Sequence, residues 1–126
     1  MPCEVFWEEE GVWRRFSGLV TGDDLIRSNL EVHTSNQFRK LKYQIVDFSG
    51  TTEFNVAEED MRTISEYDAA LAGVAPRLKV AVITVREEII GYRTLYKECT
   101  PDSCWELAYF ADLQSARNWV FGSASA

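Results

Sequence analysis

The sequence predicts an α/β fold in which a single mixed sheet, mostly parallel after an N-terminal β-hairpin, is flanked by four helices in the order ββαβαβαβα. Two β-rich runs open the chain, and helix-like and strand-like segments then alternate to its end. Helices that alternate with strands form right-handed crossovers between parallel strands. The 126 residues are expected to form one domain over residues 1–121, followed by a frayed tail over residues 122–126.

The first expected element is a hairpin over residues 3–18, "CEVFWEEEGVWRRFSG", in which Glu-Glu-Gly separates two β-rich runs. A helix start follows, with Thr21 as the N-cap and Asp24 in the capping-box position. His33, the single histidine of the chain, is expected to be a core residue with a hydrogen-bonded ring nitrogen. Helical spacing places the apolar face of this helix on Ile26, Leu30 and His33.

A strand is predicted next over residues 41–48, "LKYQIVDF", followed by a Ser-Gly-Thr-Thr loop over residues 49–52. Asn55 then predicts the N-cap of a second helix, with Glu58 at its third position. The buried face of this second helix is expected to carry Ala57, Met61, Ile64 and Leu71.

Gly73 and Pro76 are expected to end the second helix. Residues 78–85, "LKVAVITV", form a near-continuous apolar run, which is typical of a strand covered on both faces and predicts the central strand. The remaining predicted elements are a helix over residues 87–97, a strand over 105–110, "WELAYF", and a last helix capped by Asp112.

The charge of the chain limits its partners. A formal net charge of −7 at pH 7 repels nucleic-acid phosphates and anionic membrane surfaces. The start "MPCEVFWEEE" lacks the basic and apolar segments of a signal peptide, and no apolar stretch approaches the roughly 18 residues that span a bilayer. We therefore expect a cytoplasmic protein without a transmembrane segment that does not bind nucleic acid.

The cysteines do not indicate a metal site. Cys3, Cys99 and Cys104 follow neither a zinc-binding spacing nor the pattern of a secreted disulfide framework. Reduced thiols are expected, although Cys99 and Cys104 flank a turn-forming "TPDS" and leave a disulfide or redox role open. The sequence has no motif of a serine hydrolase, a zinc protease or a dinucleotide-binding enzyme, so neither a cofactor nor catalysis is expected.

The predicted loop after residue 48 is a candidate site, because functional loops follow the carboxyl ends of parallel strands. It has one glycine and no nearby Lys or Arg, so it lacks the parts of a phosphate-binding loop. The carboxylates at residues 58–60 would repel phosphate, and we expect them to interact favourably with the helix dipole. The alternative is that these carboxylates bind Mg²⁺ or Ca²⁺. The residues of this candidate loop site are Asp47, Ser49, Thr51 and Thr52.

Four segments carry a family resemblance: "GVWRRFSGLVTGDDL", "YQIVDFSG", "LKVAVITV" and "WELAYFADLQSARNWV". Their order, over residues 6–120, resembles the SpoIIAA-like family, relatives of the STAS domain. The resemblance implies a small, cytoplasmic, non-enzymatic module. STAS anti-sigma-factor antagonists are switched by phosphorylation of a serine in an Asp-Ser-Ser-Gly motif. Residues 53–56 of this chain are instead Glu-Phe-Asn-Val, and the phosphate-accepting serine is therefore missing.

The leading functional hypothesis is a binding or protein-interaction module that forms a homo-oligomer, most simply a dimer, through an edge strand or a helix face. The alternative is a carrier of an apolar small molecule or lipid between the helices and the sheet. SpoIIAA-like proteins resemble CRAL-TRIO carriers in fold, and 13% of this chain is aromatic. The ligand-binding residues expected for a carrier are Phe48, Phe54, Tyr92 and Tyr96.

Overall fold

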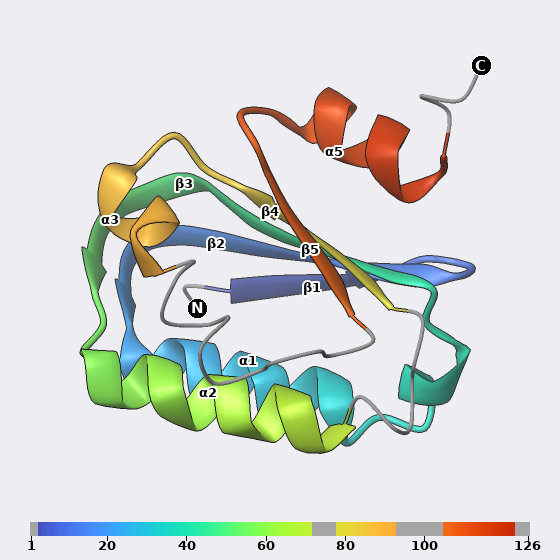
Figure 1. The fold of residues 1–126 in the computed structure, drawn as a ribbon, viewed down its shortest axis with the longest axis horizontal. Coiled ribbons are helices and arrows are strands. Elements are labelled where there is room, and N and C mark those ends of the chain that lie inside the picture. Colours follow the sequence, from blue (N-terminus) through green and yellow to red (C-terminus); the bar gives the residue numbers. More distant parts are fainter. Residues whose placement is uncertain (1–2, 72–77, 93–104, 123–126) are drawn as a thin grey trace.

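One five-stranded sheet in the order β1-β2-β3-β4-β5 organises this computed structural model, which describes residues 3–71, 78–92 and 105–122 (Figure 1). The hairpin pairs β1 with β2 antiparallel, and each later strand pairs in parallel with the strand before it. The strands are β1 (Cys3–Trp7), β2 (Gly11–Thr21), β3 (Tyr43–Asn55), β4 (Lys79–Ile83) and β5 (Glu106–Phe110). The predicted α/β class with a mixed, mostly parallel sheet is confirmed.

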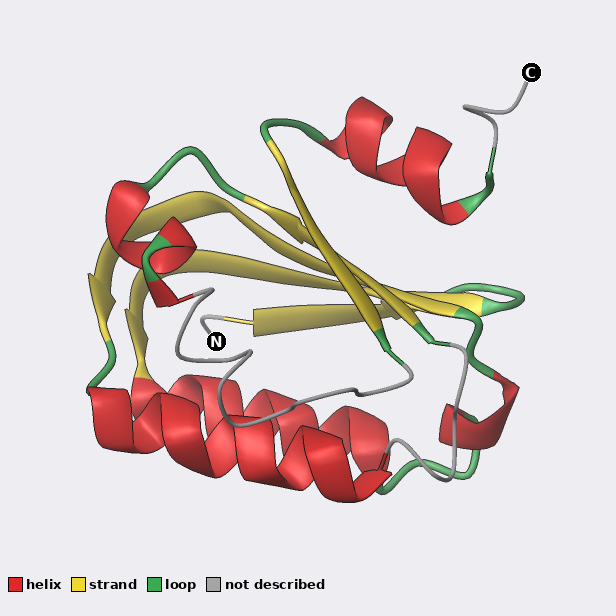
Figure 2. Ribbon diagram, viewed as in Figure 1, coloured by secondary structure: helices red, strands yellow, loops and turns green. Residues whose placement is uncertain are grey.

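The two faces of the sheet are covered unequally (Figure 2). Two helices lie side by side on one face, α1 (Gly22–His33) and α2 (Glu58–Leu71), and we call them the helix pair. Among the described residues, one helix, α5 (Leu113–Val120), lies on the other face. Each helix of the pair follows one of two parallel strands, so both run in the same direction. The short helices are η1 (Phe38–Lys40), before β3, and α3 (Glu87–Ile90), after β4.

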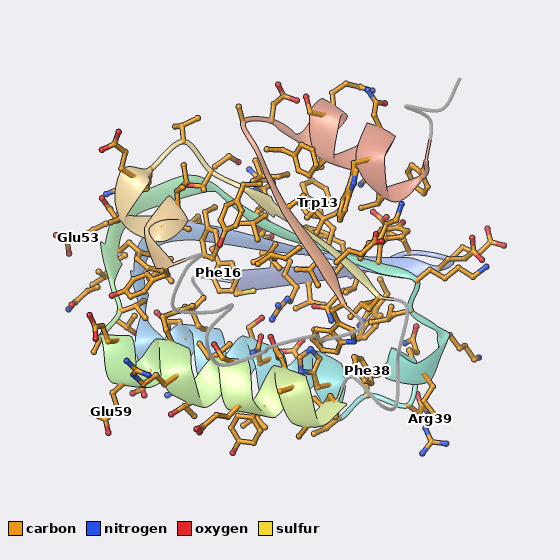
Figure 3. All side chains as sticks on the ribbon, in the orientation of Figure 1. Trp13, Phe16, Phe38, Arg39, Glu53 and Glu59 are labelled. Carbon is orange, nitrogen blue, oxygen red and sulfur yellow. The ribbon has the colours of Figure 1, made fainter. Side chains whose placement is uncertain are left out.

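Alternation along β2 decides which of its side chains enter the core. Val12, Arg14 and Phe16 are buried, whereas Arg15 is exposed. Phe16 stacks on Phe48 of β3 with ring centroids 5.0 Å apart, on the side of the helix pair. Figure 3 shows Trp13 on the opposite side, toward α5. The period-two pattern of the sequence is therefore the pattern of burial.

The start of α1 agrees with the prediction, but its buried face does not. Thr21 and Asp24 form both hydrogen bonds of a capping box. Leu30, predicted to be buried, is 45% exposed. The helix is rotated because its inner face supplies polar partners for the buried Arg14 of β2. The residues that α1 buries are Gly22, Leu25, Ser28, Asn29 and Val32.

The predicted loop over residues 49–52 is wrong, because β3 continues through it to Asn55. The neighbouring β2 extends to Thr21, so this stretch has a parallel partner: Gly50 pairs with Ser17 and Thr51 with Gly18. A β-bulge next to Gly18, whose φ is +70°, adjusts the register. The run over residues 78–85 was predicted to be the central strand, but it forms the shorter β4, and β3 is central in the strand order.

Two of the remaining helix boundaries differ from the prediction. The predicted N-cap Asn55 is the last residue of β3, and α2 begins at Glu58, with the Asp60 carboxylate accepting from the backbone N–H of Ala57. The helix predicted over residues 87–97 ends at Ile90 as α3, with Gly91 as its C-cap, and residues 93–97 lie outside the described residues. Asp112 caps α5 as predicted, accepting from the backbone N–H of Ser115 at 2.8 Å.

Candidate functional site

A cavity of about 90 Å³ lies between the sheet and the helix pair. Side chains from four strands and from α1, α2 and α3 line it, so it is enclosed by residues far apart in the sequence. Its position follows from the crossovers, which place α1 and α2 over the centre of the sheet (Figure 1). Clefts between layers that combine apolar walls with a few polar groups are the usual form of a small-molecule site.

Most of the cavity wall is apolar. Phe48 lies against Phe54 with ring centroids 5.6 Å apart at 86°, and Phe54 lies 6.2 Å from the ring of Tyr92. The Tyr92 hydroxyl donates to the backbone carbonyl of Val56, which anchors this ring at the end of β3. The aliphatic part of the wall includes Val46, Ile64, Val82, Ile89 and Leu107.

Three polar side chains mark one end of the cavity: Arg14 of β2, Asn29 of α1 and Asp68 of α2. Arg14 is only 6% exposed, and its Nη1 donates to Ser28 Oγ at 3.1 Å and to Asn29 Oδ1 at 2.6 Å. Buried charges are costly unless they are hydrogen-bonded or paired. Placing a guanidinium and a carboxylate in one wall gives the cavity a polar end with both donors and acceptors.

His33 lies beside this polar end, with its Nδ1 3.9 Å from Asp68 Oδ1. Its ring lies against Phe38 and Trp105, with centroids 4.8 and 5.9 Å away, and its Nε2 is 3.1 Å from the Gln44 amide nitrogen. Burial, with a smaller contribution from the positive charge of Arg14, lowers the pKa of His33 to about 3. The ring is therefore neutral near pH 7, as a core histidine with a hydrogen-bonded nitrogen should be.

The residues predicted as a loop site are not brought together around a pocket. Asp47 is buried and accepts from Trp13 Nε1 at 3.0 Å and from the backbone N–H of Ser49 at 2.9 Å. Thr51 is buried, whereas the side chains of Ser49 and Thr52 are exposed. Strand alternation sends Thr52 to the opposite face from its neighbours. Asp47 thus has a structural role in β3, and the loop that would have joined the four residues does not exist.

Most of the residues that the sequence predicted to bind a ligand lie at the cavity. Phe48, Phe54 and Tyr92 all line the cavity, and Tyr96 lies outside the described residues. The sequence did not predict the polar end of the cavity. One signal was available for Arg14, because it lies between Val12 and Phe16 on the alternating face that β2 buries.

The opposite face of the sheet carries a second polar group that attaches α5. Arg117 donates to both carboxylate oxygens of Glu8, at 3.1 and 2.7 Å, and the Tyr43 hydroxyl donates to the same carboxylate. The Arg117 guanidinium lowers the pKa of Glu8, while burial and then the Glu8 charge raise the pKa of Tyr43 to about 12. Arg117 also lies 5.6 Å above the Trp13 ring. These groups hold α5 on this face of the sheet.

Within the described ranges, no group of three or more His, Cys, Asp or Glu side chains is placed to hold a metal ion. In the same part of the chain, no helix combines the length and apolarity needed to cross a membrane. Of the cysteines, Cys3 is a free thiol whose pKa is raised by burial, and Cys99 and Cys104 lie outside the described residues.

Comparisons with known proteins indicate the fold of this chain but no activity. Neither a scan of protein-family models nor a search of curated proteins gave a match. A search of solved structures found an uncharacterized protein of the DUF3478 family from Shewanella loihica PV-4, described as having a SpoIIAA-like fold. That protein is 17% identical, with a TM-score of 0.50 over 94% of this chain and 91% of its own. The chain therefore has a SpoIIAA-like fold.

Proposed function

We propose that this chain is a cytoplasmic, non-enzymatic binding module whose ligand is a small, mostly apolar molecule held between the sheet and the helix pair. The observation that carries the proposal is the cavity of about 90 Å³, whose walls are aromatic and aliphatic and whose one end is polar. The net charge of −7 supports a ligand other than nucleic acid.

The cavity is costly if it has no occupant. Protein interiors are close-packed, and an unfilled cavity destabilises a fold by roughly 24 cal/mol per Å³. The coefficient refers to a closed cavity, whereas this one is open over part of its surface, so for about 90 Å³ the cost is at most about 2 kcal/mol. A ligand that filled the space would recover that free energy, and this supports binding as the reason for the cavity.

The size and polarity of the cavity narrow the class of ligand. An apolar cavity of roughly 150 Å³ accommodates benzene. This cavity of about 90 Å³ is smaller and partly open, so it excludes a lipid chain and suits a single ring of which part lies at the opening. The polar end holds one positive and one negative side chain, Arg14 and Asp68. A ligand with net charge would be attracted by one and repelled by the other, so a neutral hydroxyl or amide matches them best.

The polar groups support binding over catalysis. Arg14 donates to Ser28 and Asn29. The pKa of His33, the one histidine of the chain, is about 3, so its ring is neutral at neutral pH. A general base for work near neutral pH needs a pKa close to the operating pH. The proposed role of these side chains is accordingly to orient a ligand and to fix α1 on the sheet.

A titration with matched probes tests this proposal. Toluene, benzyl alcohol, benzoate and benzylamine share one ring and differ in their polar group. We expect benzyl alcohol to bind best and to shift the backbone amide NMR signals of Phe54 and Ile89. Val82→Phe, which puts a second ring into the cavity, should abolish these shifts, and Leu19→Phe at an exposed position of β2 should leave them unchanged. Absence of saturable shifts with all four probes would exclude the proposed ligand class.

A further inference from the structure

The outer surface of the helix pair carries an apolar groove, on the side that faces away from the sheet. Its volume is about 250 Å³, and it runs between α1 and α2. Two large side chains on it are strongly exposed, Leu30 at 45% and Tyr67 at 48%. We call this surface the outer groove. Its exposed or half-buried apolar residues are Ile26, Leu30, Tyr67, Ala70 and Leu71, and the buried Ile64 also lines it.

The outer groove is a second apolar stripe on helices that already bury one. A helix on a sheet normally has a single apolar stripe, directed at the core, and a polar opposite face. The core stripe here includes Leu25 and Val32 of α1 and Ile64 of α2. Exposed apolar surface of this kind is what a partner protein can cover.

The charged groups at the start of the helix pair and those beyond its end differ in sign, and the exposed Glu31 and Glu66 in the second half of the helices are acidic. The first turns of α1 and α2 contain only acidic charges, among them Asp23, Glu58 and Glu59. Beyond the other end, η1 contributes the exposed cations Arg39 and Lys40. Figure 3 shows Glu59 at one end of the helix pair and Arg39 at the other. A helix of the length of α2 spans roughly 21 Å, so each end acts on a partner as a separate patch.

We propose that the outer groove is the interface of a symmetric homodimer in which two helix pairs pack antiparallel. A two-fold axis through the groove brings the apolar residues of both copies together. It also places the acidic end of each copy opposite the basic end of the other, whereas a parallel arrangement would oppose like charges. Symmetric dimers need such a self-complementary surface. The apolar centre supplies the binding energy, and the charged ends set the orientation.

The dimer goes beyond the proposed ligand site and does not depend on it. The cavity lies on the inner side of the helix pair and the outer groove on its outer side. Asn29 and Ile64 line both, so the two sites are separated only by substitutions at residues that line one of them. Leu30 lines the groove and not the cavity, and Phe54 lines the cavity and not the groove.

The first test is sedimentation velocity of the full chain over a range of protein concentrations. The wild type should change from monomer to dimer as its concentration rises. Leu30→Glu should remain monomeric throughout, because the dimer would bury an unpaired carboxylate. The control is Leu19→Glu, which makes the same change at a β2 residue of almost equal exposure, 47%, and should dimerise like the wild type. A wild type that stays monomeric, or dimers of Leu30→Glu, would overturn the proposal.

The second test addresses orientation. The double variants Arg39→Glu with Lys40→Glu, and Glu58→Lys with Glu59→Lys, each give one copy two ends of the same sign. Each should be monomeric alone and should form a one-to-one dimer when the two are mixed, since both contacts then join opposite charges. Circular dichroism checks that both variants are folded. A mixture that stays monomeric while the wild type dimerises would exclude the antiparallel arrangement.

Discussion

Arg14 of β2 and Asn29 of α1 meet across the boundary between the sheet and the helix pair, with Nη1 2.6 Å from Oδ1. The contact joins a buried cation to a neutral acceptor, and hydrogen bonds of this kind contribute about 1.5–3 kcal/mol. It also fixes the rotation of α1. Asn29 and Ser28 can face Arg14 only if Leu30, one residue on, points outward. One buried arginine thus links the cavity, the helix pair and the outer groove.

The first prediction concerns this contact. Asn29→Ala removes the acceptor and leaves a buried donor of Arg14 without it, so the free energy of unfolding should fall by about 1–3 kcal/mol. The control Asn36→Ala, at an exposed position after α1, should stay within about 0.5 kcal/mol of the wild type. Urea unfolding measures both. Equal losses in the two variants would show that the Arg14 contact is not the cause.

The second prediction concerns the pH dependence of stability. Because the pKa of His33 is about 3 in the folded chain and near 6.5 when exposed, the unfolded chain binds a proton that the folded chain does not. Stability is therefore highest above pH 6.5 and should fall by about 2 kcal/mol on going to pH 5. The variant His33→Gln does not titrate, so urea unfolding should show a flatter profile between these pH values. A wild-type profile as flat as that of the variant would contradict a neutral buried ring.

The third prediction concerns the attachment of α5. Glu8→Gln removes the charge that pairs with Arg117 at 2.7 Å, in a partly buried site where the Glu8 side chain is 23% exposed. The free energy of unfolding should fall by about 1–3 kcal/mol. Glu10→Gln breaks the pair with Lys42, where the Glu10 side chain is 54% exposed, and should cost no more than about 0.5 kcal/mol. Urea unfolding followed by tryptophan fluorescence compares the two variants, because urea does not screen ion pairs. Equal losses would mean that Glu8 does not hold α5.

Local signals in the sequence predicted what local contacts determine. The capping box of α1 and the Asp112 cap of α5 involve residues three apart, and both are present. In the sequence Val12, Arg14 and Phe16 alternate with Trp13, Arg15 and Ser17, and the first three form the buried face of β2. Phe48 and Phe54 lie on the same strand at even spacing, so a cavity on that side of the sheet contacts both.

Contacts between distant elements account for what the sequence did not predict. Residues 49–52 read as a turn because of their Ser, Gly and Thr content, but the long β2 beside them supplies a parallel partner for the strand. The buried face of α1 is set by Arg14, which lies on another element. The polar end of the cavity combines β2, α1 and α2, and no spacing within one element could have indicated that grouping.

The last prediction tests the cavity through stability alone. Val82 and Val20 are both buried in the core cluster beneath the helix pair, but only Val82 lines the cavity. Val20→Phe overpacks a filled region and should lower the free energy of unfolding by about 1–3 kcal/mol or more. Val82→Phe places the added atoms in the open space, so the contacts it gains should offset most of the strain and keep stability within about 1 kcal/mol of the wild type. Urea unfolding measures both variants. If Val82→Phe proves as destabilising as Val20→Phe, the space beside Val82 does not accept atoms, and a ligand could not occupy it either.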